Sequence, residues 1–164
     1  MDRVIILDAD IASAFAKIKR LELLKRLFSK HRIVITPEIY EELTTSLDFG
    51  YSFPLDIFRY FEVFYPTEEE SEEYQKLLIE KRRLGKGELE AISICRQRGY
   101  IFSSLDAAAL RFAEENGVET LGLHSILRSL WDSCLQSKEE VKEIITEIEK
   151  KDNTKIKDVN AVFR

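Results

Sequence analysis

Four acidic residues lie far apart in the sequence, each where a strand ends or where a helix turns an apolar face inward. They are Asp8, Glu42, Glu88 and Asp106. Asp8 closes the apolar run of residues 4–7, and Glu88 and Asp106 each lead an apolar stripe at helical spacing. A carboxylate directed at a protein core is costly unless a partner compensates its charge. We therefore predict that the four carboxylates converge on a divalent cation.

The type of ligand atom indicates which cation this is. Two carboxylates about 4 Å apart repel each other by roughly 4 kcal/mol at an effective dielectric constant near 20. Four of them cannot all stay ionised in a dry pocket without a cation. Because the set offers only oxygen atoms and contains no His or Cys, it favours Mg²⁺ or Mn²⁺, as one or two ions, over zinc.

Basic residues are clustered beside two of the predicted ligands. The whole chain has a net charge of −5, which argues against a protein that simply coats nucleic acid. Residues 1–32 nevertheless hold eight Lys and Arg against four Asp and Glu. The first cluster is Lys17, Lys19, Arg20, Lys25, Arg26, Lys30 and Arg32, and the second is Lys81, Arg82, Arg83 and Lys86. One such cluster is typical of a solvated helix face, but two beside predicted ligands favour a polyanionic substrate.

Short apolar strands alternate with helices along the chain. Strands are predicted over 4–7, 33–35, 100–103 and 118–121, and helices over 11–28 with a break near Arg20, 37–45, 67–84, 88–98, 106–116, 124–136 and 138–151. Thr36 is predicted to cap the helix that Pro37 opens. The alternation indicates an α/β fold with a mainly parallel sheet. Sites in such sheets form at the carboxyl ends of the strands, which places Asp8 and Asp106 at one edge.

The remaining segments give weaker signals. Residues 46–54 are predicted to form a loop, and the aromatic segment 58–65 is consistent with either a helix end or a strand. Residues 152–164 are predicted to form a loosely held tail. Cys95 and Cys134 lie on predicted helices among apolar neighbours, which favours two buried thiols over a disulfide.

The composition places the chain among globular proteins. Charged residues make up 34% and hydrophobic residues 45% of its 164 residues, which is sufficient for one domain with a sizeable core. No apolar run approaches the roughly 20 residues that a membrane span needs. Asp2, Asp8 and Asp10 interrupt any hydrophobic segment of a signal peptide. We therefore expect a cytoplasmic protein with no membrane partner.

The order of these motifs resembles the PIN domain family, which includes the VapC toxins of toxin–antitoxin pairs. Residues 5–8 (Ile-Ile-Leu-Asp) resemble the family's apolar strand that ends in Asp. Residues 35–37 (Ile-Thr-Pro) and 40–43 (Tyr-Glu-Glu-Leu) are similar to its segment of strand, Pro, helix and Glu-Leu. The acidic residue of that segment directly precedes Leu, which selects Glu42 rather than Glu41.

The second half of the chain continues the resemblance. Residues 87–92 (Gly-Glu-Leu-Glu-Ala-Ile) resemble the family's third acidic motif, and 104–106 (Ser-Leu-Asp) resemble its Thr-x-Asp motif. Ser104 replaces the usual Thr and keeps the hydroxyl. Asp10 is an addition, which is either a further metal ligand or the N-terminal cap of the first long helix.

The resemblance implies a PIN-like three-layer fold and a metal-dependent ribonuclease. Asp8, Glu42, Glu88 and Asp106 would be both the metal ligands and the catalytic residues in the hydrolysis of single-stranded or structured RNA. Ser104 would orient Asp106, and Lys86 would contact the phosphate backbone. A domain of residues 1–136 would carry a C-terminal helix and tail, 137–164, packed on it. An antitoxin and a second copy of the chain are the protein partners that the resemblance implies.

Two alternatives remain open from the sequence. Asp8-Ala9-Asp10 also resembles the Asp-x-Asp of phosphatases with an aspartate nucleophile, although no Lys motif of that family follows. The second alternative is that the chain is a PIN-like protein-interaction module with a weak metal site. In this case the aromatic residues of 49–65 would form its partner surface. Core packing is the other explanation for those aromatic residues.

Overall fold

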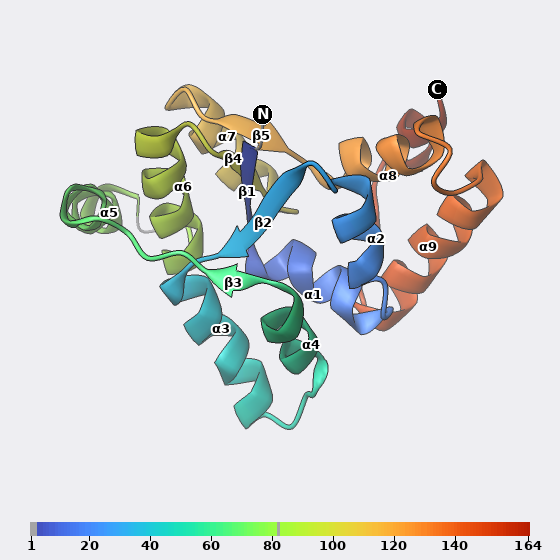
Figure 1. The fold of residues 1–164 in the computed structure, drawn as a ribbon, viewed down its shortest axis with the longest axis horizontal. Helices are drawn as coiled ribbons and strands as arrows, with labels where there is room; N and C mark the ends of the chain where they lie inside the picture. Colours follow the sequence, from blue (N-terminus) through green and yellow to red (C-terminus); the bar gives the residue numbers. More distant parts are fainter. Residues whose placement is uncertain (1–2, 82) are drawn as a thin grey trace.

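A computed structural model describes residues 3–81 and 83–164 of the chain (Figure 1). Its centre is a five-stranded sheet in the order β3-β2-β1-β4-β5, in which every neighbouring pair of strands is parallel. The strands are β1 (Arg3–Leu7), β2 (His31–Ile35), β3 (Glu62–Val63), β4 (Ile101–Ser103) and β5 (Glu119–Leu121). Two residues named above, Asp2 and Arg82, lie outside the described residues.

Helices connect the strands and flank the sheet, which confirms the predicted α/β fold with a parallel sheet. They are α1 (Ala9–Lys17), α2 (Leu21–Leu27), α3 (Pro37–Asp48), α4 (Phe53–Tyr60), α5 (Glu68–Glu80), α6 (Lys86–Arg98), α7 (Ala107–Glu115), α8 (Leu123–Asp132), α9 (Lys138–Lys151) and the 3-10 helix η1 (Val159–Phe163). In Figure 1, α5 and α6 lie to the left of the sheet, and α8 and α9 lie to its right. No helix in the described part of the chain is long and apolar enough to cross a bilayer.

The aromatic segment contains both elements that its sequence suggests. Helix α4 begins at Phe53, inside the predicted loop 46–54, and β3 follows it directly. Pro54 in the first turn fixes a backbone angle that suits a helix start, and Pro54 and Ile57 are buried. The predicted loop was too long. The connection is confined to residues 49–52, because α3 extends to Asp48 and the short α4 buries one apolar face.

The C-terminal residues are packed rather than loosely held. Ile156 and Val162 are buried, and the indole Nε1 of Trp131 donates a hydrogen bond of 2.8 Å to the carbonyl oxygen of Val162. The prediction that Cys134 is buried was also wrong. Helix α8 ends at Asp132, and Cys134 lies in the left-handed region with φ 64, where its side chain is exposed. The division of the chain at residue 136 stays a prediction.

A buried ion pair holds α5 against α6. Arg98, at the end of α6, donates hydrogen bonds of 2.9 and 2.8 Å to the two carboxylate oxygens of Glu70 and one of 2.8 Å to the carbonyl oxygen of Tyr65. Glu70 also accepts the N–H of Thr67 and so completes the capping box that begins α5. The pair anchors the helix whose other end carries Glu88.

We predict that Arg98→Met lowers the free energy of unfolding by about 2–3 kcal/mol, because it leaves the buried Glu70 carboxylate without its cation. Arg96 is the matched control, since its pair with Glu73 lies at the surface and the same substitution should cost less than about 1 kcal/mol. Urea unfolding of both variants measures the difference. Equal losses in the two variants would contradict a special role for the buried pair.

Candidate metal centre

Asp8 is fixed at the point where β1 meets α1. Its N–H donates to the carbonyl oxygen of Ser103 at 2.9 Å, which extends the pairing of β1 with β4 by one residue. Its carboxylate Oδ1 accepts the N–H of Ala9 at 2.8 Å and caps α1. The side chain is almost fully buried, with a residue exposure of 3%. The carboxylate therefore lies at the carboxyl edge of a central strand, near the positive end of the α1 dipole.

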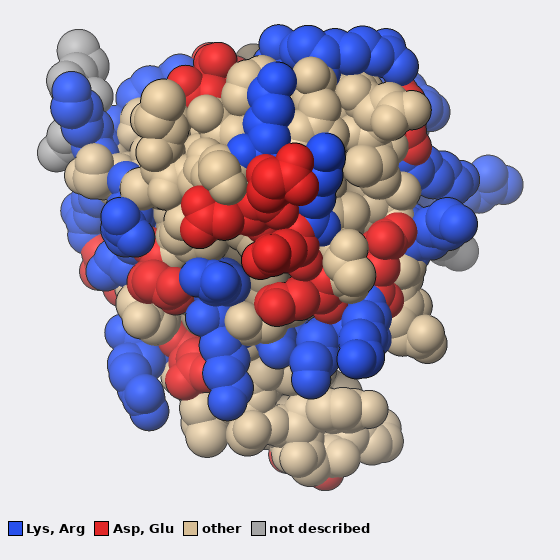
Figure 2. Space-filling view, turned by 90° about the vertical axis from the view of Figure 1, so that its right-hand side faces the viewer, with Lys and Arg blue, Asp and Glu red and all other residues tan. Residues whose placement is uncertain are grey.

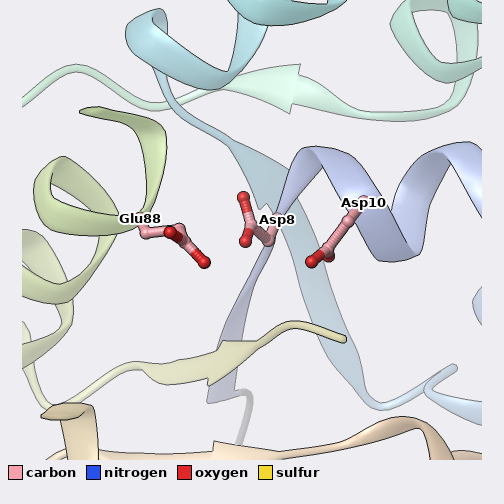
Figure 3. Close-up of side chains that lie close together, drawn as sticks. All are labelled: Asp8, Asp10 and Glu88. Carbon is pink, nitrogen blue, oxygen red and sulfur yellow. The ribbon is translucent and has the colours of Figure 1, made fainter. Parts of the chain in front are cut away.

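Three carboxylates converge at this edge (Figure 3). Asp8, Asp10 and Glu88 each place one oxygen atom so that the three atoms lie within 4.8 Å of one another. Asp10 belongs to the first turn of α1, and Glu88 belongs to the first turn of α6, where it also accepts the N–H of Gly85 at 2.8 Å. Figure 3 shows Asp10 and Glu88 on opposite sides of Asp8. The structure thus makes Asp10 a member of the cluster, whereas Asp8 is the residue that caps α1.

Ser104 connects the members of this cluster. Its hydroxyl is fully buried and lies 2.8 Å from Oδ2 of Asp8 and 3.1 Å from Oδ2 of Asp10. The single hydroxyl hydrogen is donated to one of the two carboxylates at a time, and the oxygen accepts the backbone N–H of Asp106 at 3.1 Å. Ser104 therefore positions Asp8 and Asp10, and it contacts Asp106 through the backbone rather than through the carboxylate that was expected.

The other predicted site residues lie around the cluster. Asp106 caps α7, and its Oδ1 accepts the N–H of Ala108 at 2.9 Å. Glu42 is exposed on α3 and borders, together with Asp10, a pocket of about 300 Å³. Lys86 is exposed in the first turn of α6. Within the described chain, the structure brings Asp8 and Glu88 together and leaves Glu42 and Asp106 at the margin of the group.

The electrostatics of the cluster favour a cation. Burial, followed by the charges of Asp10 and Glu88, raises the pKa of Asp8 well above its ordinary value. Burial raises the pKa of Asp10 as well. Burial, and then a hydrogen bond shared with the Asp106 carboxyl group, raises the pKa of Glu88 to about 7. The three groups resist simultaneous ionisation, and their all-oxygen donor set fits Mg²⁺ or Mn²⁺.

The sequence prediction missed Glu90, which aligns α6 with α3. Glu90 is buried, and its Oε1 accepts the N–H of Glu38 at 2.9 Å in the first turn of α3. The Thr36 side chain, which was predicted to cap this helix, makes no capping hydrogen bond. The signal in the sequence was an acidic residue between Leu89 and Ala91, in an apolar run where a charge needs a partner.

Gly87 allows the same two helices to approach each other closely. A Cβ atom at Gly87 would lie 3.0 Å from the Cγ1 atom of Ile39 and 3.6 Å from its Cα atom. A side chain there would push α6 away from α3 and displace the neighbouring Glu88. The Gly-Glu pair in the sequence is therefore one structural unit, in which the glycine provides the space and the glutamate occupies the site.

Comparison with known proteins identifies the family and the fold. The model of a family described as PIN domain matches residues 4–159. VapBC-1 from nontypeable Haemophilus influenzae has a solved structure with a TM-score of 0.56 and 14% identity, covering 73% of this chain and 97% of that one. The structure of VapBC2 from Rickettsia felis, bound to a DNA fragment from its promoter, has a TM-score of 0.55 and 15% identity, and the match covers 73% of this chain and 98% of that one. The structure of PAE2754 from Pyrobaculum aerophilum has a TM-score of 0.56 and 14% identity, and the match covers 79% of this chain and 98% of that one.

A parallel sheet with an acidic cluster at its carboxyl edge defines an α/β protein with a candidate cation site. The family match covers nearly the whole chain, and the chain belongs to the PIN domain family. No relative is found among the curated proteins. The solved structures are similar in fold, and their sequence identities to this chain are low.

The raised pKa values predict how the stability of the metal-free protein depends on pH. Between the ordinary carboxyl pKa near 4 and the folded value of about 7 for Glu88, the folded chain binds more protons than the unfolded chain. The contribution of the cluster to the free energy of unfolding therefore falls as pH rises through this window. Thermal unfolding in EDTA at several pH values measures the trend.

The same repulsion predicts that Asp8→Asn stabilises the metal-free protein at pH 7.5, by a few degrees in melting temperature. The amide oxygen still caps α1, and one negative charge leaves the cluster. Glu41→Gln, at an exposed position of α3, is the matched control and should leave the melting temperature unchanged. A lower melting temperature for Asp8→Asn in EDTA would contradict the electrostatic account.

Proposed function

We propose that this chain is a ribonuclease that depends on Mg²⁺ or Mn²⁺ and hydrolyses phosphodiester bonds of single-stranded or structured RNA. The observation that carries the proposal is the group of three carboxylates within 4.8 Å of one another in a PIN domain. Their positions at the carboxyl edge of a parallel sheet agree with the usual place of sites in such folds. A role in folding stability does not explain why the three carboxylates lie so close together, because their mutual repulsion is unfavourable without a cation.

Asp8, Asp10 and Glu88 would hold the cation, and Glu42 and Asp106 would complete the site from α3 and α7. The bound ion would polarise the phosphodiester and lower the pKa of a water molecule. Ser104 would keep the Asp8 and Asp10 carboxylates oriented through its buried hydroxyl. The proposal thus retains the four acidic residues expected from the sequence and adds Asp10.

Lys86 would contact the phosphate backbone of the substrate. It is exposed in the first turn of α6, the same turn that carries Glu88. Figure 2 shows the side of the molecule that lies to the right in Figure 1, where acidic side chains gather in the middle and basic side chains lie around them. A local cation of this kind suits one phosphate group better than a long duplex.

The partners are a further part of the proposal. Two of the similar structures are VapBC-1 and VapBC2, and VapBC2 is bound to a DNA fragment from its promoter. We extend the family resemblance to a toxin–antitoxin pair in which this chain is the cytoplasmic toxin, forms a homodimer and binds a protein antitoxin. A neighbouring small gene for a DNA-binding protein, whose product co-purifies with this chain, tests the pairing.

A second candidate is a protein-interaction module with a weak metal site. The observation in its favour is the exposure of Phe49, Tyr51 and Leu55 around the α3–α4 connection, where 78%, 60% and 52% of these residues are accessible. Exposed apolar groups of this size often mark a contact surface. Intact folding without metal affinity or RNA cleavage would favour this module over the enzyme.

The nuclease proposal predicts that the purified protein cleaves a labelled single-stranded RNA only with Mg²⁺ or Mn²⁺. Asp8→Asn and Glu88→Gln should each lower the cleavage rate by about a hundredfold or more, a loss of roughly 3 kcal/mol in transition-state stabilisation. Glu41→Gln, next to Glu42 on α3, should retain the wild-type rate. Gel analysis of the products under single-turnover conditions measures the rates. Cleavage that persists in both site variants would show a contaminating nuclease.

A further inference from the structure

A groove leads away from the carboxylate cluster between α1 and α3. Asp10, Ser13 and Lys17 follow one another at spacings of three and four residues, which places them in one row along α1. Glu42 and Ser46 form the facing row on α3. These residues line the pocket of about 300 Å³ that begins at Asp10. The groove therefore begins at Asp10, one of the three clustered carboxylates.

The groove continues into a second pocket of about 490 Å³. The two pockets share Lys17, Ser46, Phe53 and Asp152. The second pocket adds side chains from three separate parts of the chain, namely Lys19 after α1, Tyr51 before α4 and Lys151 at the end of α9. Because the four shared residues line both pockets, the two pockets adjoin, and the groove consists of two compartments that meet at these side chains.

An ion pair builds the wall between the two pockets. Lys17 Nζ lies 2.6 Å from the Asp152 carboxylate and 5.0 Å from the centre of the Phe53 ring. Both charged side chains are largely shielded from solvent, so the pair holds the residues after α9 against α1. The C-terminal part of the chain thereby supplies one side of the groove, including Lys151.

Charge and aromatic character change along the groove. The end at Asp10 and Glu42 is acidic. The distal pocket carries the exposed Lys19 and Lys151 together with Asp56, while its other carboxylate, Asp152, is paired with Lys17. Tyr51 lines the same end with 60% of its surface accessible. In Figure 2 uncharged side chains cover the lowest part of the molecule, where Figure 1 places the α3–α4 connection. An exposed aromatic ring beside two cations is the usual combination for binding single-stranded nucleic acid.

We propose that this groove binds single-stranded RNA, with a base stacked on Tyr51 and phosphates near Lys19 and Lys151 while the scissile phosphate lies at the carboxylate cluster. The inference rests on the proposed nuclease function and defines the path of its substrate. Asp10 and Lys17 are about 10 Å apart along α1, from a rise of about 1.5 Å per residue. The path is therefore short enough for a few nucleotides, and only unpaired bases are free to stack.

Fluorescence anisotropy with a short labelled single-stranded RNA tests the groove. The full-length protein is used in the Asp8→Asn background, so that binding is measured without cleavage. Tyr51→Ala should weaken RNA binding by about tenfold, and Tyr51→Phe should restore it, since base stacking requires the ring and not the hydroxyl. Lys151→Gln should weaken binding and reduce the slope of log affinity against log salt by about 0.7, the value for one phosphate of a single strand.

Two neighbouring substitutions serve as matched controls. Tyr65→Ala removes another exposed tyrosine, which lies outside the groove. Lys150→Gln removes the lysine next to Lys151, which does not line the groove. Both should leave RNA affinity unchanged. Photocrosslinking of RNA that contains iodouridine, followed by peptide mapping, should identify the peptide that contains Tyr51.

The possible outcomes distinguish a failure of the groove proposal from a failure of the nuclease proposal. If the wild type cleaves RNA but the Tyr51 and Lys151 variants bind as well as their controls, the groove proposal is wrong and the nuclease proposal stands. If the wild type neither binds RNA nor cleaves it with added metal, both proposals fail. If light scattering shows that Tyr51→Ala splits a dimer while RNA affinity is unchanged, the aromatic edge contacts a second copy, and the groove proposal is overturned.

Discussion

Repulsion between carboxylates at one edge of the sheet is the constraint that the contacts around the candidate site must offset. The starts of two helices provide the three carboxylates of Asp8, Asp10 and Glu88. Hydrogen bonds hold each carboxylate in place despite the repulsion from the other two. The backbone N–H groups at the beginnings of α1 and α6 offset part of the negative charge, because helix N-termini are electropositive. A divalent cation would offset the rest, so stability and proposed activity depend on the same charges.

The second half of the cluster depends on how α6 is positioned. Gly87 lets α6 approach α3, and the buried carboxylate of Glu90 accepts the N–H of Glu38 at the start of α3. At its other end, α6 is fixed to α5 through Arg98 and the buried Glu70. These contacts lie on both sides of Glu88. Rigid support of this kind matters because ligand positions must hold to a fraction of an ångström for metal binding.

The sequence predicted the fold well and the site in part. A polar residue directly after an apolar strand, as at Asp8, and an acidic residue leading a helical stripe, as at Glu88, are signals that local periodicity carries. Asp10 was ambiguous because residues two positions apart at a helix start normally face different directions. Contacts from residues distant in sequence, the Leu105 N–H and the Ser104 hydroxyl, show where its carboxylate lies. Glu42 follows the apolar spacing of α3, yet its side chain is exposed at the edge of the groove. The packing of the C-terminal residues also depends on contacts between distant segments, which a local pattern does not encode.

Location of the bound ion is the most direct test of this account. We predict that crystals grown with Mn²⁺ show an anomalous difference peak between the carboxylates of Asp8, Asp10 and Glu88, with oxygen ligands about 2.0–2.3 Å away. Glu42 or Asp106 should approach the same ion or a neighbouring one. The absence of a peak at saturating Mn²⁺, or a peak only at another site on the surface, would contradict the claim that these three carboxylates form a cation site.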